Sequence, residues 1–228
     1  MTTQASSNDA REGVAPLLVA DRVGVEIDGA ELLAPTSLRL MAGECVAVRG
    51  QNGAGKTTLL RVLTGRLRAS TGSVRLRDDP LEERRADHRA AIAALIEPPT
   101  LYPDLTLQDQ IALIEAAWLG ARASEDAANQ GLGADVIELF GLQALRERFP
   151  HELSSGQRQL VSLAVTFARP ADVLILDEPE QRLDPDRRSL VAEAIQLVRA
   201  RGAAIAFATH DASLVERVAD TELLVGSV

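Results

Sequence analysis

Cysteine and aromatic residues are scarce in this sequence. The 228 residues include one cysteine, Cys45, and aromatic side chains make up 3% of the chain. A single thiol excludes a framework of intrachain disulfides and a zinc site built from several cysteines. Alanine, valine and leucine must therefore supply most of the core, and we expect Cys45, which lies in a short apolar run, to be a buried residue of a strand.

Long apolar segments and an excess of positive charge are also missing. The longest stretch without Asp, Glu, Lys or Arg is residues 159–168, whereas a membrane-spanning helix needs about 20 mostly apolar residues. The start of the chain has no basic segment followed by an apolar one, so residues 1–14 are predicted to be a mobile polar arm and not a signal peptide. With 33 acidic against 24 basic residues, the net charge is −9. Such a chain is a poor candidate for binding nucleic acid over a broad surface, and we expect no nucleic-acid partner.

Strand and helix patterns alternate along the chain and indicate its fold class. Apolar and polar residues alternate as in half-buried strands over residues 17–27 and 36–41. Continuous apolar runs, typical of strands covered on both faces, occur at residues 45–48, 173–176 and 203–209. Helical spacing follows at residues 59–63, 107–141, 157–168 and 185–200. This order predicts an α/β fold with a mainly parallel sheet between helices, in a single domain of residues 15–228.

A glycine-rich segment joins the strand pattern at residues 45–48 to the next helix. Its sequence, GQNGAGKT, fits the phosphate-binding pattern G-x-x-x-x-G-K-[ST]. In such a loop, backbone N–H groups and the positive N-terminus of the helix bind phosphate. We expect Lys56 to reach the β- and γ-phosphates of ATP and the Thr57 hydroxyl to ligate Mg²⁺. The predicted ATP-binding residues here are Gly50, Asn52, Gly53, Ala54, Gly55, Lys56, Thr57 and Thr58.

Two acidic residues end the apolar run at residues 173–176. Asp177 and Glu178 stand where parallel α/β sheets place their ligand-binding groups, at the carboxyl end of a strand. Asp177 fits the role of a second Mg²⁺ ligand, and Glu178 fits that of the group that polarises the attacking water.

The segment LSSGQ at residues 153–157 narrows the prediction to one family. With it, the sequence resembles the ATP-binding cassette (ABC) family, whose motifs occur here in order as GQNGAGKT, IEPP, LSSGQ, VLILDEP, LDP and ATHD. The resemblance covers about residues 17–225. It implies a P-loop NTPase core with a mainly parallel sheet, an N-terminal antiparallel β subdomain and an inserted α-helical subdomain at about residues 100–165.

The resemblance also implies further site residues. Members of the family form head-to-tail dimers in which each ATP lies between the P-loop of one cassette and the signature of the other. The signature residues Ser154, Ser155, Gly156 and Gln157 would then contribute to ATP binding, and Asp184 matches the loop that contacts the partner cassette. His210 matches the histidine that contacts the γ-phosphate and orients the catalytic water. Glu178 and His210 are therefore the predicted catalytic residues.

Several positions depart from the usual family pattern. Ser155 replaces a glycine, Ile27 lies near the position of an aromatic residue that stacks on adenine, and Glu97 replaces a glutamine. A glutamate can still ligate Mg²⁺, so Thr57, Asp177 and Glu97 are the predicted metal ligands. The link of residues 180–182, Glu-Gln-Arg, replaces the short neutral link that is commoner in the family. The segment around Glu97 is similar to cassettes of the bacitracin and lantibiotic self-resistance group, which favours export.

The resemblance thus implies an ATP-hydrolysing subunit that powers transport through separate membrane-spanning subunits, on the cytoplasmic face of the cell membrane. The dimer would contain two copies of the chain or two different cassettes. One alternative is a soluble cassette protein that acts on nucleic acid or ribosomes. Two features argue against this alternative. Leu153 follows Lys56 too closely to leave room for a long coiled coil between the P-loop and the signature, as in DNA-repair cassettes. The chain also has a single cassette of negative net charge, whereas cassettes that act in translation come in pairs and are usually basic at their contacts. The other alternative, a nucleotide-binding module that does not hydrolyse ATP, is disfavoured by the joint presence of Lys56, Asp177, Glu178 and His210.

Overall fold

Two β-sheets organise the chain in the computed structural model, which describes residues 15–119 and 132–226. The first sheet is antiparallel, in the order β2-β1-β4-β5. The second is parallel, in the order β6-β7-β8-β3-β9. The predicted α/β fold with its antiparallel β unit is confirmed, while the predicted arm of residues 1–14 lies outside the described residues. The strands are β1 (Leu18–Ile27), β2 (Ala30–Leu40), β3 (Cys45–Arg49), β4 (Thr71–Leu76), β5 (Asp79–Pro80), β6 (Ile92–Leu95), β7 (Val173–Asp177), β8 (Ala204–Ala208) and β9 (Thr221–Leu224).

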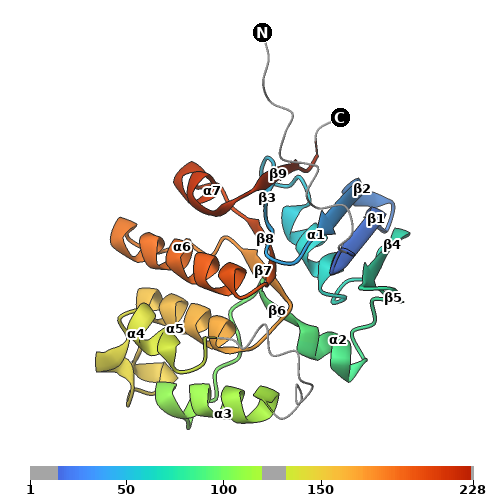
Figure 1. Ribbon diagram of the computed structural model, residues 1–228. Helices are drawn as coiled ribbons and strands as arrows, with labels where there is room; N and C mark the ends of the chain where they lie inside the picture. Colours follow the sequence, from blue (N-terminus) through green and yellow to red (C-terminus); the bar gives the residue numbers. More distant parts are fainter. Residues whose placement is uncertain (1–14, 120–131, 227–228) are drawn as a thin grey trace.

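Helices cover both faces of the parallel sheet (Figure 1). Helix α1 packs on the face that also meets the antiparallel sheet, whereas α5 and α6 pack on the other face. The helices are α1 (Lys56–Leu63), α2 (Ala86–Ala91), α3 (Leu107–Leu119), α4 (Asp135–Leu139), α5 (Ser155–Ala168), α6 (Pro185–Ala200) and α7 (Ala212–Val218), with short 3₁₀ turns at Gln143–Leu145 and Pro150–Glu152.

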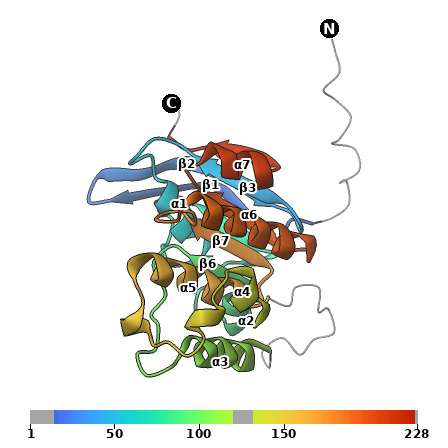
Figure 2. The ribbon, with the colours of Figure 1, turned by 90° about the vertical axis from the view of Figure 1, so that its left-hand side faces the viewer.

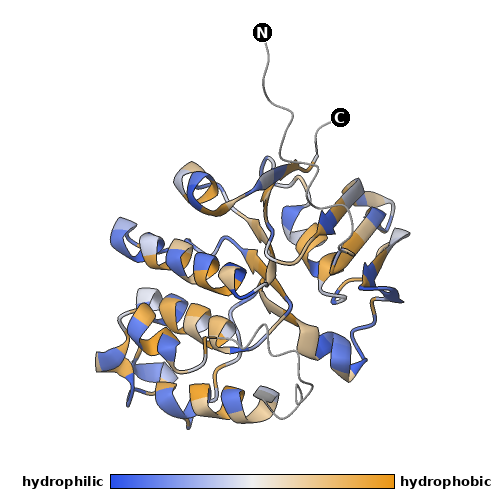
Figure 3. Ribbon diagram, in the orientation of Figure 1, coloured by the Kyte–Doolittle hydropathy of each residue, from blue (hydrophilic) through white to orange (hydrophobic). Residues whose placement is uncertain are grey.

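Side-chain alternation explains why one short strand can serve two cores. In β3, Val46 and Val48 belong to the apolar cluster around α1, and Cys45 and Ala47 to the cluster around α5 and α6. Successive strand residues point to opposite faces, so a strand with helices on both sides must be apolar throughout. Figure 3 shows this on the central strands and on the inner sides of the helices. Cys45 is fully buried in β3, as expected.

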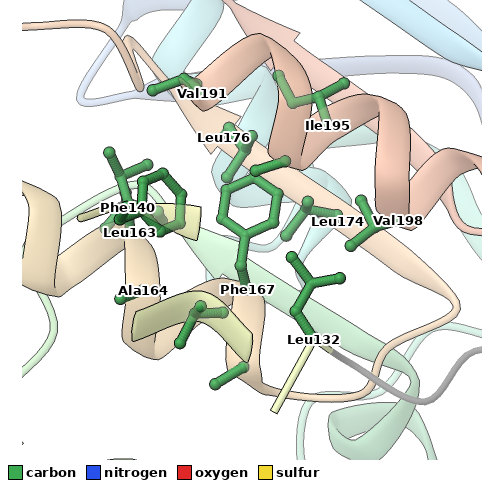
Figure 4. Close-up of a cluster of buried hydrophobic side chains, with 14 of the residues drawn as sticks. Leu132, Phe140, Leu163, Ala164, Phe167, Leu174, Leu176, Val191, Ile195 and Val198 are labelled. Carbon is green, nitrogen blue, oxygen red and sulfur yellow. The ribbon is translucent and has the colours of Figure 1, made fainter. Parts of the chain in front are cut away.

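The apolar cluster around α5 and α6 lies between the parallel sheet and the helices α3 to α6 (Figure 4). Its centre is Phe167, which is 1% exposed and has its ring 5.9 Å from the ring of Phe140. Helices α3 and α4 both pack against α5, and the view of Figure 2 places this helical region at the end of the molecule opposite β1 and β2. No helix in the described ranges is both long and apolar enough to span a bilayer.

Several features differ from the sequence prediction. The continuous helix expected over residues 107–141 is instead the two helices α3 and α4, and the described residues 132–134 before α4 are not helical: Leu132 donates its N–H to the carbonyl of Phe167, and Gly133 has a left-handed φ of 53°. Residues 120–131 of that range lie outside the described residues. Strand β2 begins at Ala30 instead of residue 36. The short strands β6 and β9 and the helix α7 were not anticipated.

Candidate functional site

The register of the parallel sheet brings three chain segments to one level. Ala208 of β8 pairs with Val48 of β3 on one side and with Asp177 of β7 on the other. The glycine loop, Glu178 and His210 begin one or two residues beyond these positions. The strand ends therefore deliver the predicted phosphate-binding and catalytic residues to the same edge of the sheet, where α/β folds bind ligands.

The glycine loop between β3 and α1 has a backbone shape that requires glycine. Gly53 and Gly55 have φ values of 82° and 95°. A Cβ atom on Gly55 would lie 2.5 Å from the carbonyl oxygen of Leu32, closer than a non-bonded contact allows. Gly55 is also the N-cap of α1 and provides no side-chain hydrogen bond to it. The first N–H groups of α1 are thus available to an anion, as in other phosphate-binding loops.

Lys56 lies against this loop. Its ammonium group donates hydrogen bonds to the carbonyl oxygens of Gly50 at 2.9 Å and Gln51 at 3.1 Å, and the residue is only 7% exposed. A groove of about 810 Å³ opens beside the loop, within the size range of ligand sites. It is lined by Arg49, residues 50–54, His210 and residues 224–226.

Thr57 and Asp177 form the predicted pair of oxygen ligands. The Thr57 hydroxyl donates to Oδ2 of Asp177 at 2.6 Å. Burial raises the pKa of the Asp177 carboxyl, an effect that the Thr57 hydrogen bond opposes and the nearby Glu178 reinforces. A half-buried carboxylate beside a hydroxyl fits a hard cation such as Mg²⁺, which prefers oxygen ligands and would relieve the cost of burying the charge.

Glu178 lies in a strained turn directly after β7. Its φ of 46° is in the left-handed region, where non-glycine residues are rare and cluster at functional sites. The turn is fixed by the Glu178 N–H, which donates to the carbonyl of Ala208 at 2.8 Å, and the side chain accepts from Nε2 of Gln181 at 2.8 Å. The second carboxylate oxygen is 3.6 Å from Nε2 of His210. The two predicted catalytic residues thus lie together.

The signature residues begin α5, in another part of the molecule. Ser154 is the N-cap, and its hydroxyl accepts from the N–H of Gln157, whose side chain accepts from the N–H of Ser154. Ser154 and Ser155 are exposed. Helix α5 packs with α3, α4, α6 and β6, whereas α1 packs with β1, β2, β7 and β8. As far as the described residues go, the groove at the glycine loop contains none of the signature residues.

Comparison with known proteins gives the family. The profile of the ABC transporter family matches residues 33–181. The chain belongs to the ABC transporter family. The prediction made from the ordered motifs is therefore confirmed.

Two curated relatives of this ABC chain have opposite transport directions in their names. The Nod factor export ATP-binding protein I of Paraburkholderia xenovorans (strain LB400) is 33% identical over 182 residues, which are 80% of this chain and 59% of that protein. The molybdenum import ATP-binding protein ModC of Mycobacterium tuberculosis (strain ATCC 25618 / H37Rv) is 34% identical over 192 residues, 82% of this chain and 52% of that protein. The chain thus matches little more than half the length of these relatives.

Solved structures of the family have the same fold. A structure described as the ATP-binding subunit of an ABC transporter superposes with a TM-score of 0.80 at 28% identity, over 93% of this chain and 88% of that chain. A nucleotide-free ATP-binding cassette gives a TM-score of 0.73 at 20% identity, over 92% of this chain and 87% of that one. At 20% identity, the likeness to this second structure concerns the fold alone.

Two residues that depart from the ABC pattern lie in exposed positions. Glu97 accepts a hydrogen bond from Arg61 at 2.7 Å, with both side chains largely exposed. Arg61 is also close enough to lower the pKa of Asp177, so one guanidinium serves two of the three predicted metal ligands. Ile27 ends β1 and is 46% exposed.

Three residues of this region, Glu180, Gln181 and Thr209, have contacts that the sequence does not predict. The amide of Gln181 donates to Glu178. Glu180 is buried and bonded to Thr209. The spacing of Gln181 from Glu178, three residues, was a usable signal because it allows contact within a single turn. Nothing in the sequence alone paired Glu180 with Thr209.

Proposed function

We propose that this chain binds and hydrolyses ATP and powers transport through separate membrane-spanning subunits. The observation that carries the proposal is the convergence of Lys56, the Thr57–Asp177 pair and the Glu178–His210 pair at the carboxyl ends of β3, β7 and β8. This set contains a phosphate-binding cation, oxygen ligands for a metal, and a candidate base for a water molecule.

Each residue has a role that its contacts allow. The N-terminus of α1 and the ammonium of Lys56 bind phosphate oxygens, which would take the place of the loop carbonyls that Lys56 now contacts. Glu178 accepts a proton from, or polarises, the attacking water. His210, half-exposed at the groove, orients that water and contacts the terminal phosphate.

Mg²⁺ is the cofactor that the oxygen ligands fit. Thr57 and Asp177 would hold it, with Glu97 as a third ligand after release from Arg61. When bound, the metal neutralises charge on the phosphates. Among the described residues no group of three or more His, Cys, Asp or Glu side chains is placed to hold a metal, so the phosphates and water would complete its coordination.

A second cassette is proposed to complete the site, and the exposure of Ser154 and Ser155 supports this. Ser154, Ser155, Gly156 and Gln157 at the N-terminus of α5, with Asp184 at the start of α6, would contact ATP held by the partner cassette. Such a dimer would work on the cytoplasmic face of a membrane, bound to permease subunits. Export is the direction that the segment around Glu97 favours.

The test of hydrolysis is Glu178→Gln, with Glu193→Gln on the exposed face of α6 as the matched control. We expect the Glu178 variant to bind ATP normally and to lose on the order of 10²-fold or more in turnover, the scale of general-base loss. The variant should also accumulate as an ATP-bound dimer in light scattering, because cleavage separates the two halves. Turnover near that of the control variant would contradict the assignment.

A further inference from the structure

Glu180 is a carboxylic acid in a position where burial is costly. It is 7% exposed, although glutamate is almost never fully buried unless it is paired. Its Oε1 accepts a hydrogen bond from the hydroxyl of Thr209, while Oε2 is buried without a hydrogen-bond partner among the described residues. Burial raises the pKa of this carboxyl, and the nearby Asp211 and Glu178 raise it further, whereas the Thr209 hydrogen bond opposes the shift. A group held at such a cost calls for a role beyond stability.

The partner of Glu180 precedes the candidate switch histidine. Thr209, 1% exposed, follows β8, and its hydroxyl oxygen also accepts the N–H of Asp211 at 2.9 Å. Asp211 is fixed in turn, because its carboxylate caps α7 and accepts from Nη1 of Arg188 at 3.0 Å. His210 is therefore held through both of its chain neighbours, and its own side chain remains half-exposed at the groove.

On its other side, Glu180 is close to Glu178. Only Pro179 separates the two, and Glu178 has the strained φ of 46°. In the part of the chain that the structure describes, two hydrogen bonds join this turn to the end of β8 beside the Glu178–His210 contact: the Glu178 N–H donates to the carbonyl of Ala208, and the Thr209 hydroxyl donates to Glu180. Strained backbone persists where surrounding contacts over-determine it.

We propose that Glu180 is a positioning residue for hydrolysis: by accepting the Thr209 hydrogen bond, its carboxyl holds the end of β8, with His210, against the turn that carries Glu178. Among the described residues, the side-chain hydrogen bond of Glu180 is with Thr209 and not with His210. Glu180 therefore acts indirectly, by fixing the separation of Glu178 and His210, the two groups proposed to act on the water. The inference rests on the roles proposed above for Glu178 and His210.

The test compares Thr209→Val, which removes the hydroxyl and keeps the shape, with Thr209→Ser, which keeps the hydroxyl. Thr166→Val is the matched control, since Thr166 is also a buried threonine, 6% exposed, whose hydroxyl bonds a carbonyl within α5. We expect Thr209→Val to lower kcat by about 10- to 100-fold, as misplacement of a catalytic group does, with KM for Mg-ATP changed less than twofold. Thr209→Ser should recover most of the loss. Thr166→Val should change kcat less than twofold, although its shift in Tm should be similar to that of Thr209→Val.

A second pair of variants keeps the test informative if Thr209→Val folds poorly. Glu180→Gln retains an acceptor for Thr209 and should keep kcat within about threefold of wild type, whereas Glu180→Leu should reproduce the loss. In a His210→Ala background, Glu180→Leu should add little, because residues that act as a unit are not additive. Equal loss in Thr209→Val and Thr166→Val, or a full additional loss in the His210→Ala background, would overturn the proposal. A Glu178→Gln variant with normal turnover would instead contradict the proposed function, whatever the Thr209 variants do.

Discussion

Gly53 and Gly55 provide a comparison within one loop. Both have left-handed φ values, 82° and 95°, so an alanine at either position is strained. Their surroundings differ, since a Cβ on Gly53 would have no atom within 4 Å, while one on Gly55 would meet the Leu32 carbonyl oxygen at 2.5 Å and a methyl group of Leu33 at 3.1 Å. The pair of variants Gly53→Ala and Gly55→Ala therefore separates backbone strain from steric overlap.

The expected losses follow from these contacts. A left-handed residue other than glycine costs roughly 1–2 kcal/mol, which is the whole effect expected for Gly53→Ala. Gly55→Ala adds overlap with backbone that cannot rotate away, and overpacking typically costs about 1–3 kcal/mol more. The free energy of unfolding should thus fall by about 2–5 kcal/mol in Gly55→Ala. For a chain of this size each 1 kcal/mol lowers Tm by about 2–4 °C.

Urea unfolding without nucleotide measures the difference directly, because phosphate binding then makes no contribution. The midpoint should fall in both variants and further in Gly55→Ala, with the same m-value as wild type. Equal losses in the two variants would mean that β2 moves away from the loop at no cost. A larger loss in Gly53→Ala would refute the reasoning outright.

Three further outcomes are expected. Ser154→Arg should abolish the ATP-dependent dimer in light scattering while leaving nucleotide binding by the monomer unchanged; weaker binding by the monomer would contradict the head-to-tail arrangement. Glu97→Gln should change the basal ATPase rate by less than about tenfold but lower the apparent affinity for Mg²⁺, since a carboxylate is the better ligand for a hard cation; an unchanged Mg²⁺ dependence would leave Glu97 as a surface partner of Arg61. Burial raises the pKa of Cys45 from 9.0 to about 12, so at pH 8 the thiol should react with a thiol reagent only on unfolding. The free energy of unfolding should fall as the pH rises above 9, because the unfolded thiol then ionises and the folded one does not.

Features encoded within a few consecutive residues could be predicted from the sequence. The glycine loop between a strand and a helix, and the helix that begins at residue 185, were both expected. Helix α6 begins there, with the Asp184 carboxylate as its N-cap accepting the N–H of Arg187 at 2.9 Å. The run of residues 173–176 was recognised as a buried strand because every residue in it is apolar. Such signals are local, so they can be interpreted from the sequence without knowledge of the fold.

Features that depend on distant parts of the chain could not be predicted. The bond between Glu180 and Thr209 exists because β7 lies next to β8, and the bond between Arg61 and Glu97 joins α1 to the loop after β6. The order of the strands in the sheet cannot be predicted from any single segment of the sequence. The strands β6 and β9 have four residues each, too few for their patterns to be distinguished from loops.

Register is the property of the sheet on which the whole site depends. The level pairing of Val48, Ala208 and Asp177 is set by side chains in the middle of the strands, which alternate between the two apolar clusters. A slip of one residue between β7 and β8 would turn each apolar side chain to the wrong face and shift the strand ends by about 3.3 Å. The contact of 3.6 Å between Glu178 and His210 could not survive such a shift. The apolar residues that fix the register, remote from the groove, thus determine the catalytic geometry as directly as the residues that line it.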